Sequence, residues 1–133
     1  MKELTTTEIG RFGEDAAAKH LKKNGFRILE RNFRASHNEI DIIASSKDTI
    51  VFVEVKTRTP QRDGADFGTP AEAVTYSKQK RTIAAARAYL YKSGCEKQIR
   101  FDVIEVYLER SPRFSAKRLT VKSLEHIVDA FSA

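Results

Sequence analysis

The sequence has little of what secreted, disulfide-stabilised or membrane-spanning proteins need. Cys95 is its only cysteine, so no internal disulfide can form, which suits a reducing compartment. No stretch approaches 18 consecutive apolar residues, and the N-terminus has no apolar run of signal-peptide length. We therefore expect a soluble, cytoplasmic protein.

The motifs of several enzyme classes are also missing. The sequence has no phosphate-binding glycine loop, no nucleophile elbow and no internal repeat. Its histidines, His20, His37 and His126, are scattered without the spacing of zinc ligands. A zinc site is therefore not expected.

Positive charge, in contrast, is in excess. Lys and Arg number 24 against 18 Asp and Glu, which gives a net charge of +6. A basic surface attracts phosphate without sequence specificity, although ribosome-associated and membrane-surface proteins share this property. The 133 residues suit one domain with a single core. Nucleic acid is thus a reasonable partner.

Two apolar segments, 38–43 and 50–56, carry ionisable groups where a purely structural sheet would have more valines. These groups are Asp41, Glu54 and Lys56. A buried charge is costly unless it is paired or binds a metal ion. The three residues form either a compensated ion cluster or a metal site, and the order of acid, acid and lysine favours the metal site.

The spacing of these groups suits phosphodiester hydrolysis. Glu54 and Lys56 project from the same face of a strand, and a turn at 45–48 would bring Asp41 near them on an antiparallel neighbour. A divalent cation relieves the repulsion between two carboxylates, and oxygen ligands suit Mg²⁺. The lysine can hold or deprotonate a water and stabilise a phosphate. A buried salt bridge without chemistry is the structural alternative.

The first predicted helix, at about 8–24, carries another acid. Thr5 and Glu8 match a capping box, and Gly25 is placed to end the helix. Glu14 lies outside the charged face, and its helical neighbours are small or apolar. It therefore points into a groove where a backbone or a metal ion can approach, or it is a boundary residue paired with a lysine.

Three motifs now carry a family resemblance: Gly-Glu-Asp-Ala-Ala, Glu-Ile-Asp and Phe-Val-Glu-Val-Lys-Thr-Arg. Together they resemble the YraN-type family of small bacterial proteins, which is similar to the PD-(D/E)xK, or restriction-endonuclease-like, nuclease superfamily. The match extends over about 8–108. It implies an α/β fold with an αβββαβ core, in which helices flank a mixed central sheet. One departure is Asn38, where the family usually has glycine.

The resemblance also assigns roles to residues. Asp41 and Glu54 correspond to metal ligands, Lys56 to the lysine of the (D/E)xK pair, and Glu14 to the helix-borne acid of branch-resolving members. Glu39 lies two residues before Asp41 on the same strand face. It would take the role of Asp41 if the assignment of the first strand acid is shifted. The implied cofactor is Mg²⁺ or Mn²⁺.

Basic residues near this site are candidates for phosphate contact. Arg58 and Arg62 lie in a polar segment, 57–68, that we expect to overhang the site. A solvated loop is the alternative, more so for Arg62 than for Arg58. Lys78, Lys80 and Arg81 lie in the first turns of a second helix, where cations oppose the helix macrodipole. A helix N-terminus with three cations is a reasonable phosphate site; a solvated helix face is the alternative.

The remaining elements follow from apolar periodicity and turn residues. We expect one domain, 1–133, with its core at about 8–108 and an extension at 109–133 whose residues 123–131 form a short covering helix. The expected strands are 26–33, 39–44, 49–56 and 100–107, and the second helix is 77–92.

The sequence thus predicts a metal-dependent nuclease that hydrolyses phosphodiester bonds, above all of DNA, with branched DNA as a candidate substrate. One alternative is a non-catalytic module that binds nucleic acid or a repair partner. Another is a structural protein whose ion cluster only specifies packing. Resolution of a symmetric junction would call for a two-fold homodimer, but no stripe of the sequence identifies a dimer face.

Overall fold

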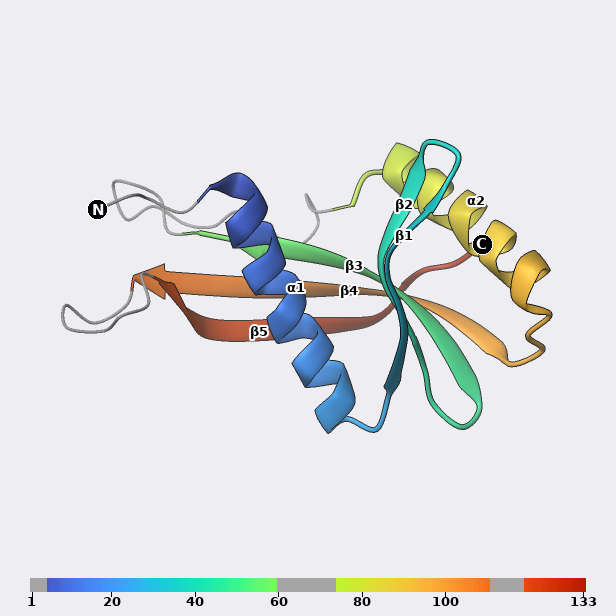
Figure 1. Ribbon diagram of the computed structural model, residues 1–133, viewed down its shortest axis with the longest axis horizontal. Coiled ribbons are helices and arrows are strands. Elements are labelled where there is room, and N and C mark those ends of the chain that lie inside the picture. The colour runs from blue at the N-terminus through green and yellow to red at the C-terminus, as the bar shows by residue number, and fades with distance from the viewer. Residues whose placement is uncertain (1–4, 60–73, 111–118) are drawn as a thin grey trace.

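The apolar segments build a mixed five-stranded sheet with one helix on each face (Figure 1). The computed structural model describes residues 5–59, 74–110 and 119–133. The elements in chain order are α1 (Thr6–Lys23), β1 (Arg27–Ala35), β2 (Asn38–Ser45), β3 (Thr49–Arg58), α2 (Tyr76–Ser93), β4 (Gln98–Arg110) and β5 (Leu119–Phe131). The predicted αβββαβ core and mixed sheet are confirmed.

The strands pair in chain order, β1 to β5. β3 and β4 are parallel, and the other three pairs are antiparallel. A parallel pair needs a crossover, and α2 lies in that connection. β3 is therefore central, and its apolar residues alternate between the two faces. Val51 and Val53 pack in the cluster with α1, whereas Ile50 and Phe52 pack in the cluster with α2.

The helix ends match the capping residues of the sequence. Thr5 Oγ1 accepts a hydrogen bond from Glu8 N at 3.1 Å, and Glu8 Oε1 accepts one from Thr5 N, which completes the predicted capping box. Asn24 is the C-cap of α1 and is followed by Gly25, whose φ of +87° favours glycine. No helix within 5–59, 74–110 or 119–133 is long and apolar enough to cross a membrane.

Close contact between α1 and β3 depends on Gly13. This residue is buried, and a Cβ there would overlap the side chain of Thr57. The helix backbone therefore lies directly against the end of the central strand. As a result, the next residue, Glu14, is held near the ends of β2 and β3.

The predicted helix at 123–131 is wrong, because these residues belong to β5. Leu124, Ile127, Val128 and Phe131 have helical spacing, but two register irregularities in the β4–β5 ladder disturb the alternation of a strand. β4 contains a run of six buried residues, Phe101–Val106, and needs a partner on its free side. β5 provides it as an antiparallel edge strand.

Candidate active site

Asp41 lies where β2 and β3 separate. The last paired residues at this end of the ladder are Ile42 and Val53. Beyond them, Asp41 Oδ2 accepts a hydrogen bond from Val55 N at 2.8 Å. The carboxylate thus takes the place of a ladder hydrogen bond and is held at the end of the central strand.

A second carboxylate lies close enough to Asp41 to affect its ionisation. Burial, followed by the charge of Glu54, raises the pKa of Asp41 from its ordinary 3.8 to about 7, although the Val55 N–H opposes the shift. Glu14 contributes in the same direction. Because two negative charges repel each other here, the pair would be stabilised by a cation between them.

Glu54 is only 4% exposed and contacts two lysines. Lys56 Nζ lies 3.6 Å and Lys78 Nζ 3.4 Å from the same atom, Glu54 Oε1. Lys56 comes from the same strand, as the E-x-K spacing predicts, and Lys78 comes from the first turn of α2. The structure thus places one of the predicted phosphate-binding residues directly at the acid–lysine pair.

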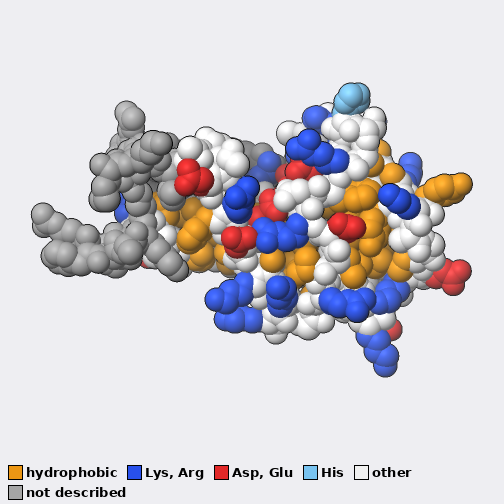
Figure 2. Space-filling model, viewed as in Figure 1, with side chains coloured by type: hydrophobic (Ala, Val, Ile, Leu, Met, Phe, Trp, Pro, Cys, Tyr) orange, Lys and Arg blue, Asp and Glu red, His pale blue; other side chains and the backbone are white. Residues whose placement is uncertain are grey.

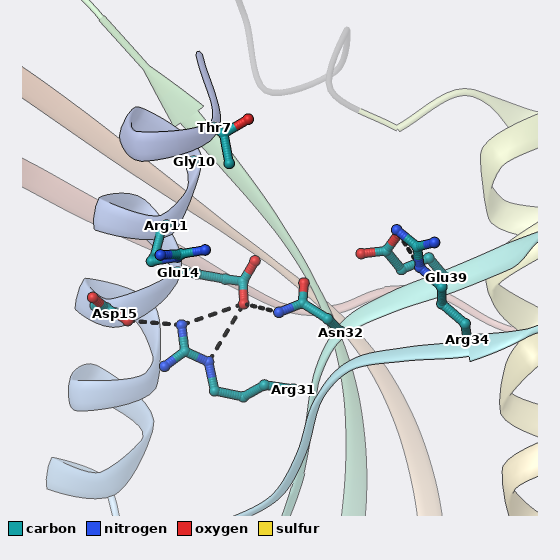
Figure 3. A pocket seen from close by; sticks show the side chains of 9 residues that line it. All are labelled: Thr7, Gly10, Arg11, Glu14, Asp15, Arg31, Asn32, Arg34 and Glu39. Atoms are coloured by element: carbon teal, nitrogen blue, oxygen red, sulfur yellow. Dashed lines mark hydrogen bonds and ion pairs between the residues drawn. The ribbon is translucent and has the colours of Figure 1, made fainter. Parts of the chain in front are cut away.

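Glu14 lies in a hollow of about 490 Å³ between α1 and the β1–β2 hairpin. Its Oε1 accepts hydrogen bonds from Arg31, at 3.3 and 3.4 Å, and from Asn32, at 3.1 Å. Figure 3 shows Arg31 reaching from β1 towards Glu14 and Asp15 on α1. Burial raises the pKa of Glu14, and the Arg31 charge partly offsets this shift.

Glu39, the substitute for Asp41 in the sequence prediction, lines the same hollow. It pairs with Arg34 at 3.4 Å, and Figure 3 shows both on the side of the hollow away from α1. Asp41 is the strand acid that lies close enough to Glu54 for that charge to raise its pKa.

The three predicted metal ligands do not form one preassembled group. Among the residues that the structure describes, no three His, Cys, Asp or Glu side chains lie in a cluster that could hold a metal ion. Asp41 and Glu54 fit a hard cation by their oxygen donors and mutual repulsion, with water as the remaining ligands. Glu14 is instead engaged by Arg31 and Asn32.

The other predicted phosphate-binding residues differ in how strongly they are engaged. Arg58 lies on β3 and pairs with the fully buried Glu105 at 3.4 Å. Its buried Nε has no hydrogen-bond partner among the described residues. Lys80 Nζ lies 4.7 Å from the centroid of the Tyr76 ring, and Arg81 contacts Ser77 at 3.4 Å. Arg62 lies outside the described residues.

Sequence reasoning missed Glu105. This carboxylate is 0% exposed, accepts a hydrogen bond from Tyr107 Oη, and lies opposite Lys56 in the β3–β4 register. An acid within the apolar run of β4 is the same signal that identified Glu54. Asp102, a second acid in this strand, is also fully buried and is held by Arg100 at 2.8 and 2.9 Å.

Charge on the α1 side of the molecule is mixed. Figure 2 shows Lys and Arg side chains spread over this face, with Asp and Glu among them near its centre. Positive and negative side chains are therefore interspersed on this face.

The model of the uncharacterised protein family UPF0102 matches residues 13–106, which include Glu14, Asp41, Glu54 and Lys56. The chain belongs to this family. A UPF0102 protein of Caldanaerobacter subterraneus subsp. tengcongensis is 43% identical over 132 residues, which cover 98% of this chain and 100% of that protein. UPF0102 proteins of Chlorobium chlorochromatii and Clostridium botulinum (strain Loch Maree) are 46% and 48% identical, over 96% and 76% of this chain and 93% and 80% of theirs. The YraN-type family predicted from the motifs is thereby confirmed.

Among solved structures, SfsA of Pyrococcus furiosus in complex with Ca²⁺ aligns with a TM-score of 0.48 and 16% identity. The alignment covers 86% of this UPF0102 chain and 63% of the SfsA chain, less than two thirds of its length. Similarity of this degree transfers neither a ligand nor an activity to the UPF0102 protein.

Proposed function

We propose that this UPF0102 protein is a metal-dependent nuclease that hydrolyses phosphodiester bonds of DNA. The observation that carries the proposal is the pair of acids Asp41 and Glu54 on β2 and β3, which lie close enough for the charge of Glu54 to contribute to the Asp41 pKa of about 7. A site without a cation would keep this repulsion at a cost in stability. The adjacent lysines extend the pair into a site that can act on a phosphate.

The residues divide the work as follows. Asp41 and Glu54 would hold Mg²⁺ or Mn²⁺, which supplies a Lewis acid that offsets the charge developing on the phosphate. Lys56, 3.6 Å from Glu54 Oε1, would orient the attacking water. Lys78, 3.4 Å from the same oxygen, would contact a phosphate oxygen.

Glu14 has a different place in this proposal from the one that the family resemblance implies. Its Oε1 is bonded to Arg31 and Asn32, so it would complete a metal shell only through its second oxygen or through water. We assign it first to positioning Arg31 in the hollow beside the site, from which the guanidinium would contact a bound strand.

The experiment is cleavage of labelled duplex, single-stranded, flap and four-way-junction DNA in Mn²⁺, Mg²⁺ or EDTA. We expect cutting that requires metal and is lost in Asp41→Asn and Lys56→Ala. Asp48→Asn and Lys47→Ala, on the exposed turn of the same hairpin, make the same changes of charge and should leave cutting intact. Cleavage that survives both site variants would refute the proposal.

A binding module that does not cut is the second candidate. It is favoured by one observation: Glu54 already contacts two lysines, and Glu14 already contacts Arg31 and Asn32. Salt-dependent binding of one DNA shape that neither metal nor Asp41→Asn alters would support this candidate.

A further inference from the structure

A chain of three polar side chains connects α1, β4 and β5 on the α1 side of the sheet. Asp102 Oδ2 lies 2.7 Å from His126 Nε2, and His126 Nδ1 lies 3.0 Å from His20 Nε2. Glu54, by contrast, contacts Lys78 of α2. The histidine cluster is therefore separate from the proposed nuclease site.

The buried end of the chain is fixed and charged. Asp102 is fully buried, and it accepts two hydrogen bonds from Arg100 and one from the backbone N–H of Asp129. Burial opposes its charge, but the hydrogen bonds from His126 and Arg100 outweigh this effect and lower the pKa of Asp102. A carboxylate in this position accepts a hydrogen bond from His126 Nε2–H, and the tautomer of the His126 ring that donates this bond leaves Nδ1 unprotonated towards His20.

Histidines that bind metals show this arrangement: one ring nitrogen donates to a carboxylate, and the other binds the ion. The two inner nitrogens, His20 Nε2 and His126 Nδ1, face each other at 3.0 Å. Two nitrogens that share a tetrahedral zinc ion lie about 3.3 Å apart, given Zn–N bonds of about 2.0–2.1 Å. The rings, whose centroids are 5.1 Å apart, would have to separate by a few tenths of an ångström and turn so that both nitrogens point at the ion.

We propose that His20 and His126 form a binding site for a divalent transition-metal ion of the zinc class, with Asp102 orienting His126 and with waters completing the coordination. Imidazole nitrogens favour such ions over Mg²⁺. The bound ion would join α1, near its C-terminal end, to the edge strand β5. The separation of 106 positions between the two histidines explains why sequence spacing did not predict the site.

The surroundings of His20 agree with this role. Burial, His126 and Lys23 all lower the pKa of His20, so that it is neutral, as a ligand must be, at neutral pH. Lys23 is also the nearby cation that opposes a metal ion. With two protein ligands and this opposing charge, we expect micromolar or weaker affinity.

The test is zinc binding by the full-length protein without a purification tag, after EDTA treatment and dialysis at neutral pH. Zn²⁺ should bind saturably, raise the melting temperature, and shift the imidazole ¹⁵N signals of His20 and His126. Asp102→Asn should weaken binding by about 10- to 100-fold. His20→Ala should abolish it while leaving the His126–Asp102 contact in place.

A matched control separates this site from others. His37→Ala removes a histidine on the exposed turn between β1 and β2 and should not alter zinc affinity. Zinc binding that is unchanged in His20→Ala, or no saturable binding up to millimolar Zn²⁺, would overturn the proposal and leave the pair as a hydrogen bond. Because the readout is zinc affinity, failure here leaves the proposed nuclease activity untouched.

Discussion

Asp41 sits at the point where two strands part, and folding changes its chemistry more than that of a surface acid. Its carboxylate is held by Val55 N–H and repelled by Glu54, and its pKa rises from 3.8 to about 7. The folded protein therefore holds the Asp41 proton more tightly than the unfolded chain does. The stabilisation linked to that proton is complete below pH 3.8 and is lost as the pH rises through about 7.

This linkage predicts that Asp41→Asn stabilises the metal-free protein at alkaline pH. The asparagine oxygen can still accept from Val55 N–H, but it carries no charge to repel Glu54. We expect a gain on the order of 1–2 kcal/mol at about pH 8 and little difference near pH 4. Urea denaturation in EDTA at several pH values measures it.

Mn²⁺ provides the control, because it should raise the stability of the wild-type protein at about pH 8 more than that of the variant. If the difference in the free energy of unfolding between the two proteins did not change with pH, the ionisation of Asp41 would not destabilise the fold.

The position of Asp41 near Glu54 could be predicted because period-two alternation and one hairpin turn are local in the sequence. Asp41 and Glu54 lie on adjacent strands joined by a short turn. The contact between Glu54 and Lys78 could only be suspected, since it depends on how α2 returns to the sheet. The His20–His126 pair had no local signal at all, because α1 and β5 meet only in the folded protein.

At the scale of elements, the approach of α1 to β3 depends on a missing side chain. We predict that Gly13→Ala destabilises the protein by about 1–3 kcal/mol, because its Cβ would overlap Thr57 and force the helix away from the strand. Gly10→Ala is the matched control, since a Cβ there meets nothing within 4 Å. It should stabilise the helix by up to about 1 kcal/mol.

Urea denaturation of the three proteins tests this pair of changes. Equal stability of Gly13→Ala and Gly10→Ala would contradict the close contact. Cleavage by Gly13→Ala, measured under conditions where it is folded, would further show whether the placement of Glu14 matters to the proposed activity.

The two helices and the first four strands could be predicted because their caps and apolar patterns agree. Thr5 and Gly25 bracket α1, and β3 is apolar on both faces. β5 could not be predicted, because its apolar pattern has helical spacing and only the pairing with β4 makes it a strand. The buried run of β4 requires a partner on its free edge, and that requirement outweighs the helical spacing of Leu124, Ile127 and Phe131.

Across the whole molecule, the net charge of +6 predicts salt-dependent binding of DNA. We expect the affinity for DNA in EDTA to fall with added NaCl. Removing a cation that contacts a phosphate should reduce the slope of log affinity against log salt concentration by about 1. Lys78→Gln, Lys80→Gln and Arg81→Gln should each reduce the slope, as measured by fluorescence anisotropy.

Lys92→Gln is the control. Lys92 lies in the last turn of the same helix, and its substitution changes the net charge by the same amount. If all four variants shifted the slope equally, the effect would reflect net charge and not a phosphate site at the start of α2.

The parallel pairing of β3 with β4 has a consequence for synthesis on the ribosome. β1, β2 and β3 are consecutive and can pair as soon as they emerge, but β3 stays an edge strand until α2 and β4 have been made. During that interval a strand with buried residues on both faces is open to other chains. Nascent chains that end before residue 98 should therefore be the most aggregation-prone species this gene product forms, and the translation of α2 sets how long they last.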